Sequence, residues 1–296
     1  MATDLGEVSG LGEVSGPLAV LLDTLDLEAI DRNLYRGKTP PTRLQRIFGG
    51  QVAAQALVAA GRSVVGKTVH SLHAYFLRAG DPAASVVYEV DPIRDGRSYS
   101  TRRVVGLQDG RAIFNLQASF KVPEPGYDRQ VPFPEGAADP ETLPTWPGFP
   151  SGGRVDDEPE ALPPPSFPLE LRVAPKAGGY ERLIWWRTLG ALAEDPTLHA
   201  CVAAYASDLT LLSVPIETFA AEAAAAGRDF RPPAFVASLD HAMWFHRPLR
   251  VDRWMLYAQS SPSSGDGRGL CLGQMFGVDR SLAITVVQEG AIRPPR

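Results

Sequence analysis

The chain has 296 residues, with 29 basic and 34 acidic side chains that give a net charge of −5. Nucleic-acid-binding proteins usually carry a basic excess, so this balance argues against that class of partner. Its two cysteines, Cys201 and Cys271, lack the spacing of a metal site or a disulfide scaffold. We find no secretory signal and no run of 18 apolar residues, so we expect a cytoplasmic protein without a membrane span.

The chain is expected to begin with a flexible leader, residues 1–17, in which the hexapeptide LGEVSG occurs twice in tandem. Helical apolar spacing starts at Leu18, and a second helical segment covers 48–64. Short strands are then predicted up to residue 120, because Asp95-Gly96 and Asp109-Gly110 are turn signals typical of antiparallel hairpins.

A proline-rich stretch divides the chain into two parts of similar size. About half of the 27 prolines lie between residues 121 and 175. Proline lacks a backbone donor and disfavours both helices and central strands. We therefore predict an extended or partly disordered linker over residues 123–178, between an N-terminal domain, 18–122, and a C-terminal domain, 179–296.

The two parts contain similar elements in the same order. In each, a helical segment (48–64 and 198–212) precedes a block of predicted strands that opens with Ser-Leu and contains an Asp-Gly-Arg turn. A glutamine lies in the last strand of each block, at Gln117 and Gln288. The pattern predicts an α+β fold in which two helix-plus-antiparallel-sheet repeats form one continuous sheet.

Two polar residues stand out on apolar faces. Asp208 lies on a mainly apolar stripe of the helical segment 198–212, and a buried unpaired carboxylate is costly. We expect it either to face a polar partner or to reach solvent at the helix end. Gln288 closes an apolar row of the predicted strand 282–288, and its amide needs hydrogen-bond partners whether its role is structural or functional.

Other groups support chemistry less clearly. Asp240 and His241 are adjacent, but neighbouring strand residues point to opposite faces, so we interpret the pair as structural. Arg94 and Arg97 flank a turn and could meet phosphates, although a solvated hairpin is the more common explanation. The sequence contains no GxSxG, HExxH, P-loop or GxGxxG motif, so we predict no metal and no organic cofactor.

Long segments of both parts closely resemble the acyl-CoA thioesterase II family. The matching segments are YRGKTPP (35–41), FGGQVAAQAL (48–57), VHSLHAYFLRAGDP (69–82), YEVDPIRDGRSYSTRRV (88–104), AYASDLTLL (204–212), SLDHAMWFHRPL (238–249) and VQEGAIR (287–293). The resemblance implies a double hotdog fold, hydrolysis of fatty acyl-CoA to free acid and CoA, and a homo-oligomer of double hotdogs.

The family's catalytic set of an Asp, a Thr or Ser, and a Gln falls here on Asp208, Ser238 and Gln288. Ser238 stands where the bacterial members carry Thr, so the hydroxyl is kept. We expect the three side chains to hold one water that Asp208 deprotonates. The Gly49-Gly50 turn is the candidate oxyanion site, because amides at a helix N-terminus stabilise negative charge.

The first half has no matching Asp, since Gln51 and Gln55 lie at that helix position, so one active site per chain is expected. Arg94 and Arg97 are candidates for binding the CoA phosphates. Two other functions stay open: a hotdog hydratase or dehydratase using Asp240 and His241, and a non-catalytic acyl-CoA-binding or assembly protein.

Overall fold

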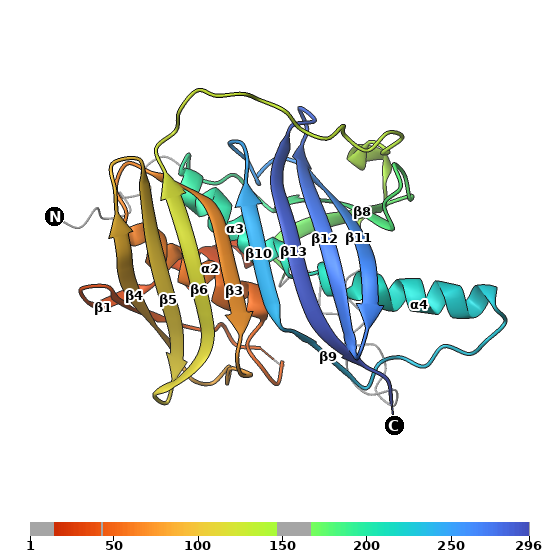
Figure 1. Ribbon diagram of the computed structural model, residues 1–296, viewed down its shortest axis with the longest axis horizontal. Helices are drawn as coiled ribbons and strands as arrows, with labels where there is room; N and C mark the ends of the chain where they lie inside the picture. The colour runs from red at the N-terminus through yellow and green to blue at the C-terminus, as the bar shows by residue number, and fades with distance from the viewer. Residues whose placement is uncertain (1–14, 43, 147–166, 296) are drawn as a thin grey trace.

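The computed structural model describes residues 15–42, 44–146 and 167–295, which form one long antiparallel sheet with helices against one face (Figure 1). The helices are α1 (Pro17–Leu25), α2 (Gly49–Arg62), α3 (Pro196–Ser207) and α4 (Val214–Ala225), with short 3-10 turns η1 (Pro140–Thr142) and η3 (Leu211–Ser213). The strands are β1 (Glu28–Asp31), β2 (Leu34–Gly37), β3 (Thr68–Phe76), β4 (Val86–Asp95), β5 (Tyr99–Gln108), β6 (Arg111–Lys121), β7 (Leu169–Ala174), β8 (Arg182–Thr188), β9 (Phe235–Ser238), β10 (Asp240–Phe245), β11 (Met255–Gly265), β12 (Arg268–Gly277) and β13 (Leu282–Arg293).

The order of the strands confirms the predicted repeat. The sheet runs β1-β2-β4-β5-β6-β3-β10-β13-β12-β11-β8-β7, so the two halves meet where β3 pairs with β10, with Ala242 opposite His73. Each half supplies six strands of this path and one central helix, α2 or α3. The result is the continuous sheet of a double hotdog.

The two central helices are antiparallel and very close together. Gly50 near the start of α2 lies against the carbonyl oxygen of Tyr205 near the end of α3, and Gly61 lies against Thr197 at the other end. A Cβ on Gly50 would come within 2.5 Å of that oxygen, so only glycine permits this approach. The packing places the first turn of α2 beside the last turn of α3.

The predicted linker is wrong over part of its length. The strand β7 (Leu169–Ala174) lies inside 123–178 and pairs with β8, because an edge strand can follow a proline such as Pro168 without losing ladder bonds. The described part up to residue 146 also packs on the C-terminal half, since Trp185 Nε1 donates to Ala138 O at 2.9 Å. Residues 147–166 and the predicted leader up to residue 14 lie outside the described chain.

Two other expectations need correction. The helical segment 198–212 ends at Ser207, so Asp208 is the residue that caps α3 rather than a residue inside the helix. The glutamines of the two repeats are not equivalent, because Gln117 is exposed on the outer face of the sheet whereas Gln288 is fully buried beneath it. A repeat in sequence therefore does not mean a repeated site.

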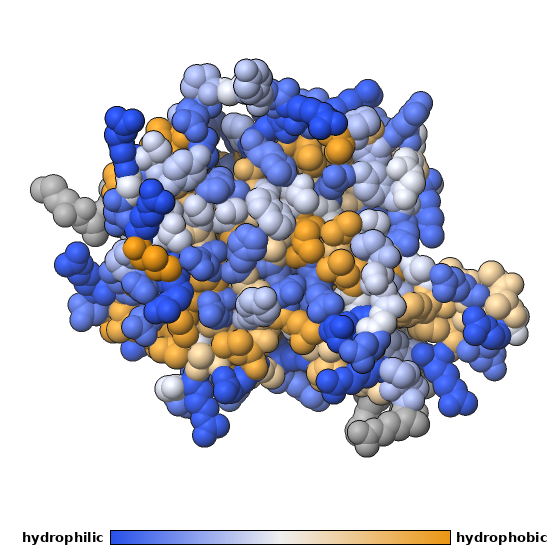
Figure 2. Space-filling model, viewed as in Figure 1, coloured by the Kyte–Doolittle hydropathy of each residue, from blue (hydrophilic) through white to orange (hydrophobic). Residues whose placement is uncertain are grey.

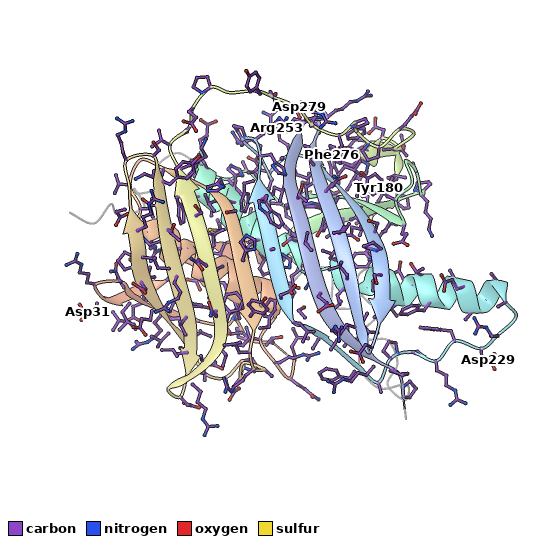
Figure 3. The ribbon with its side chains drawn as sticks, in the orientation of Figure 1. Asp31, Tyr180, Asp229, Arg253, Phe276 and Asp279 are labelled. Carbon is purple, nitrogen blue, oxygen red and sulfur yellow. The ribbon has the colours of Figure 1, made fainter. Side chains whose placement is uncertain are left out.

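The stretch Pro196–Ala225 is long and apolar enough to cross a membrane, but 67% of its apolar window is buried inside the protein. It is divided into α3, which lies in the core, and α4, which projects from the body and appears as a pale orange extension in Figure 2. The chain then turns near Asp229, labelled in Figure 3, and returns to the sheet as β9.

Candidate active site

Three polar side chains from separate elements meet at the end of α3. Asp208 caps this helix, Ser238 ends β9, and Gln288 lies on β13. Ser238 Oγ is 3.2 Å from Asp208 Oδ1, and Gln288 Nε2 is 2.5 Å from that oxygen and 2.8 Å from Ser238 Oγ. The structure thus brings all three residues of the predicted catalytic set into direct hydrogen-bond contact.

The backbone around Ser238 explains how it reaches the cluster. Strand β9 pairs with β13, with Ser238 opposite Gly290, and a break at Leu239 separates it from β10. Asp240 closes this break, because its Oδ1 accepts the backbone N–H of Glu289 at 2.8 Å. Gly290 leaves the space that Leu212 of η3 occupies, so the turn after Asp208 packs onto the same strand end.

The first turn of α2 contacts the carboxylate directly. The backbone N–H of Gly50 donates to Asp208, and a Cβ on Gly49 would lie 2.7 Å from Asp208 Oδ2. The Gly49-Gly50 turn was predicted as an oxyanion site. In the structure this turn lies beside Asp208. The Gly50 amide bonds the carboxylate, and the Gly49 amide precedes it in the chain.

The carboxyl group of Asp208 is enclosed by protein although the residue as a whole is half-buried. Burial raises the pKa of Asp208 to about 6, against the opposing effect of hydrogen bonds from Gln288, Ser238 and the Gly50 amide. Burial outweighs these bonds because it penalises the ionised form directly. A carboxylate with a pKa near neutrality is suited to accept a proton at physiological pH.

Asp240 and His241 do not form an acid–base pair. Asp240 is bonded to the backbone of β13, whereas the His241 ring is buried beneath the sheet with Nε2 2.8 Å from Ser207 Oγ. The two side chains bond different neighbours because they point to opposite faces of the strand, as predicted. Ser207 is a contact that sequence reasoning missed, because a serine inside an apolar helix gives no periodic signal.

The expected coenzyme arginines do not lie at this cluster. Arg94 and Arg97 belong to the β4–β5 hairpin, whose neighbour Arg102 donates to Ser63 Oγ at 2.7 Å, just past the end of α2. That helix has 14 residues and is about 21 Å long, so its end is far from Gly49 and Asp208. Their role in binding the CoA phosphates stays a prediction, because the pantetheine arm of CoA separates its phosphates from the thioester that Asp208 would face.

A cavity also lies away from the cluster. It measures about 260 Å³ and is lined by Arg253 and Asp279, which Figure 3 labels at one end of the sheet, together with Trp254. The backbone at Val251 contacts His199 in the first turn of α3, the end opposite to Asp208.

Among the described residues, no three His, Cys, Asp or Glu side chains are grouped to hold a metal ion.

Comparisons with known proteins agree with both halves of the fold. A family model described as acyl-CoA thioesterase matches residues 170–291, and one described as acyl-CoA thioesterase N-terminal domain matches 38–121. Acyl-coenzyme A thioesterase 8 of Mus musculus is 40% identical over 98% of this chain and 95% of its own. Acyl-CoA thioesterase 2 of Haemophilus influenzae is 33% identical over 92% of this chain and 96% of its own. The crystal structure of an acyl-CoA thioesterase II, TesB2 from Mycobacterium marinum, is 39% identical, with a TM-score of 0.75, over 93% of this chain and 98% of that one.

Proposed function

The chain belongs to the acyl-CoA thioesterase family and is therefore an acyl-CoA hydrolase, and from this premise we propose that it cleaves fatty acyl-CoA with one water held by Asp208, Ser238 and Gln288. The observation that carries the proposal is the mutual contact of these side chains at 2.5 to 3.2 Å around a carboxylate whose pKa is raised to about 6. A carboxylate, a hydroxyl and an amide supply the acceptors and donors that one water needs.

In the proposed reaction Asp208 removes a proton from the water as its oxygen attacks the thioester carbonyl carbon. Ser238 and Gln288 bond the carboxylate and hold it in the orientation that positions the attacking water, which lowers the entropy cost of the step. The carbon–sulfur bond then breaks and CoA leaves as a thiolate. An aliphatic thiol with a pKa of about 8.5 is a good leaving group, so a strong general acid is not required.

The start of α2 is suited to stabilise the charge that develops on the carbonyl oxygen. The Gly50 amide bonds the carboxylate, and the Gly49 amide is its neighbour in the first turn. Backbone amides at a helix N-terminus carry partial positive charge and need no reorganisation during the reaction. We therefore assign the oxyanion contact to the Gly49 amide and the anchoring of Asp208 to the Gly50 amide.

The function is tested by following thiol release and loss of thioester absorbance with acyl-CoAs of short, medium and long chains. Hydrolysis of at least one class with ordinary enzymatic turnover is the expected result. Turnover of enoyl- or 3-hydroxyacyl-CoA at the double bond without thiol release would favour the hydratase alternative. Binding without any turnover would favour an acyl-CoA-binding protein. Cytoplasmic localisation and a homo-oligomer stay predictions, which fractionation and light scattering test.

The pH profile gives a second expected result. Because the carboxylate form of Asp208 accepts the proton, kcat/KM is expected to fall about tenfold per pH unit below an apparent pKa of about 6. Initial rates measured between pH 5 and 8 give this limb. Since a phosphate monoester also titrates at about pH 6, acyl-pantetheine without the nucleotide is the control substrate. A profile that stays flat down to pH 5 with acyl-pantetheine would rule out Asp208 as the titrating base.

A further inference from the structure

A buried histidine lies directly behind the candidate active site. His241 on β10 is 1% exposed, and its Nε2 is 2.8 Å from Ser207 Oγ. Burial lowers the pKa of His241 to about 4, against a smaller opposing effect of the nearby Gln288 carboxamide, so the ring is neutral at physiological pH. A neutral imidazole has one donor nitrogen and one acceptor nitrogen, and its neighbours decide which is which.

The neighbour on the other side of the ring is Gln288. Strands β10 and β13 pair with Ala242 opposite Val287, so continuing this register brings His241 opposite Gln288, and both side chains point to the buried face. His241 Nδ1 and Gln288 Oε1 are both buried, and neither has a hydrogen-bond partner among the described residues. A carbonyl oxygen can only accept, so the two atoms satisfy each other only if Nδ1 carries the proton.

We propose that His241 is a positioning residue whose Nδ1–H donates to Gln288 Oε1. Its Nε2 then accepts the single hydroxyl proton of Ser207, in preference to the Ala204 carbonyl oxygen that lies 2.9 Å from the same Oγ. This inference rests on the proposed function, because it concerns how the catalytic amide is held. The contact fixes which end of the carboxamide faces Asp208. With Oε1 held by the ring, both protons of Gln288 Nε2 are directed to Asp208 Oδ1 and Ser238 Oγ.

The orientation matters because a carboxamide can rotate by half a turn with little change in shape. A rotated Gln288 would put its carbonyl oxygen against the Asp208 carboxylate, where two acceptors repel each other and the water loses a fixed base. Ser207 is itself held in place, since Tyr257 donates its phenol to the Ser207 carbonyl oxygen at 3.1 Å. With the proposed contact, hydrogen bonds connect Ser207, His241 and Gln288 in series to the Asp208 carboxylate, and we call this series the relay.

Two matched variants separate this role from simple packing. An asparagine amide nitrogen stands close to where the Nδ1 of histidine would lie, whereas a glutamine amide nitrogen stands close to Nε2. His241→Asn keeps a donor toward Gln288, so kcat is expected to stay within about threefold of the unmodified protein. His241→Gln keeps only the contact with Ser207, so kcat is expected to fall about tenfold or more with KM nearly unchanged. Equal losses in both variants would overturn the proposal.

A double-mutant cycle identifies the partner through which His241 acts. Gln288→Ala is expected to lower kcat, and His241→Gln in that background is expected to cause no further loss, because residues in one relay are not additive. A full additional loss would contradict the relay. If Gln288→Ala alone leaves turnover unchanged, the proposed catalytic set is wrong. If it lowers turnover while the two His241 variants behave alike, only the inference on His241 fails.

The tautomer itself can be read in the unmodified protein, so the proposal does not depend on the variants folding. Nitrogen-15 spectra of histidine-labelled protein distinguish the protonated ring nitrogen of each of the five histidines, and contacts of the ring protons with Ser207 identify the signal of His241. Protonation at Nδ1 between pH 6 and 8 is expected. Protonation at Nε2 would overturn the assignment.

Discussion

Replacing Asp208 by Asn is expected to lower kcat for acyl-CoA hydrolysis by on the order of 10²-fold or more, because the amide cannot accept the proton of the attacking water. The substitution nearly preserves shape, and Ser238 and Gln288 can still donate to the oxygen that stands in for Oδ1. Thiol release under substrate saturation measures the loss, and circular dichroism checks that the variant is folded.

Asp195→Asn is the matched control for that experiment. Asp195 caps the other end of the same helix, where its Oδ1 accepts the N–H of Thr197 at 2.8 Å. Asparagine caps helices about as well as aspartate, so both stability and turnover are expected to stay close to those of the unmodified protein. Near-normal turnover of folded Asp208→Asn would refute the assignment of the general base.

Replacing Gly50 by Ala is expected to damage both stability and turnover. Its Cβ would lie 2.5 Å from the carbonyl oxygen of Tyr205 and 2.5 Å from the Phe48 ring, so α2 must move away from α3. Forcing an extra carbon into such packing costs about 1–3 kcal/mol of unfolding free energy. The shift also separates the Gly50 amide from Asp208, so kcat is expected to fall by on the order of 10²-fold.

Gly61→Ala in the same helix provides the comparison. Its Cβ would meet only the methyl group of Thr197, at 2.9 Å, and that side chain can adjust. Alanine is the better helix former by about 1 kcal/mol, so this variant is expected to keep its stability and its turnover. Thermal unfolding and saturating rates measured on both variants decide the matter. A fully stable and active Gly50→Ala protein would contradict the close approach of the two helices at the site.

The fold could be predicted because the same elements follow one another in the same order in both halves of the sequence. A helical segment before a block of hairpins occurs twice, and each half needs the other to continue its sheet. The strand β7 escaped prediction because the prolines around it outweigh six residues of weak strand signal. Proline density marks where regular structure is rare, but it does not exclude an edge strand.

The candidate site could be predicted in residue type but less well in position. Asp208 and Gln288 each interrupt an apolar row, and such an interruption in a buried stretch requires a polar partner. The break at Leu239 was not predicted, because the alternation of residues through Asp240 and His241 fits one continuous strand as well as two. Arg94 and Arg97 were assigned by charge alone, and the structure places their hairpin near the end of α2, away from Asp208.

The direct attack of water can be tested by one single-turnover experiment in water enriched in oxygen-18, with enzyme in excess over acyl-CoA. If Asp208 acts as a general base, the fatty acid released in the first turnover carries the heavy isotope and the peptide that contains Asp208 does not. If Asp208 instead attacks the carbonyl carbon, CoA leaves as a thiolate and a mixed anhydride forms, which hydroxylamine traps. Water that opens this anhydride at the aspartyl carbon leaves the first acid with only ordinary oxygen and puts the label into the Asp208 carboxylate. That second result would contradict the account given for this site.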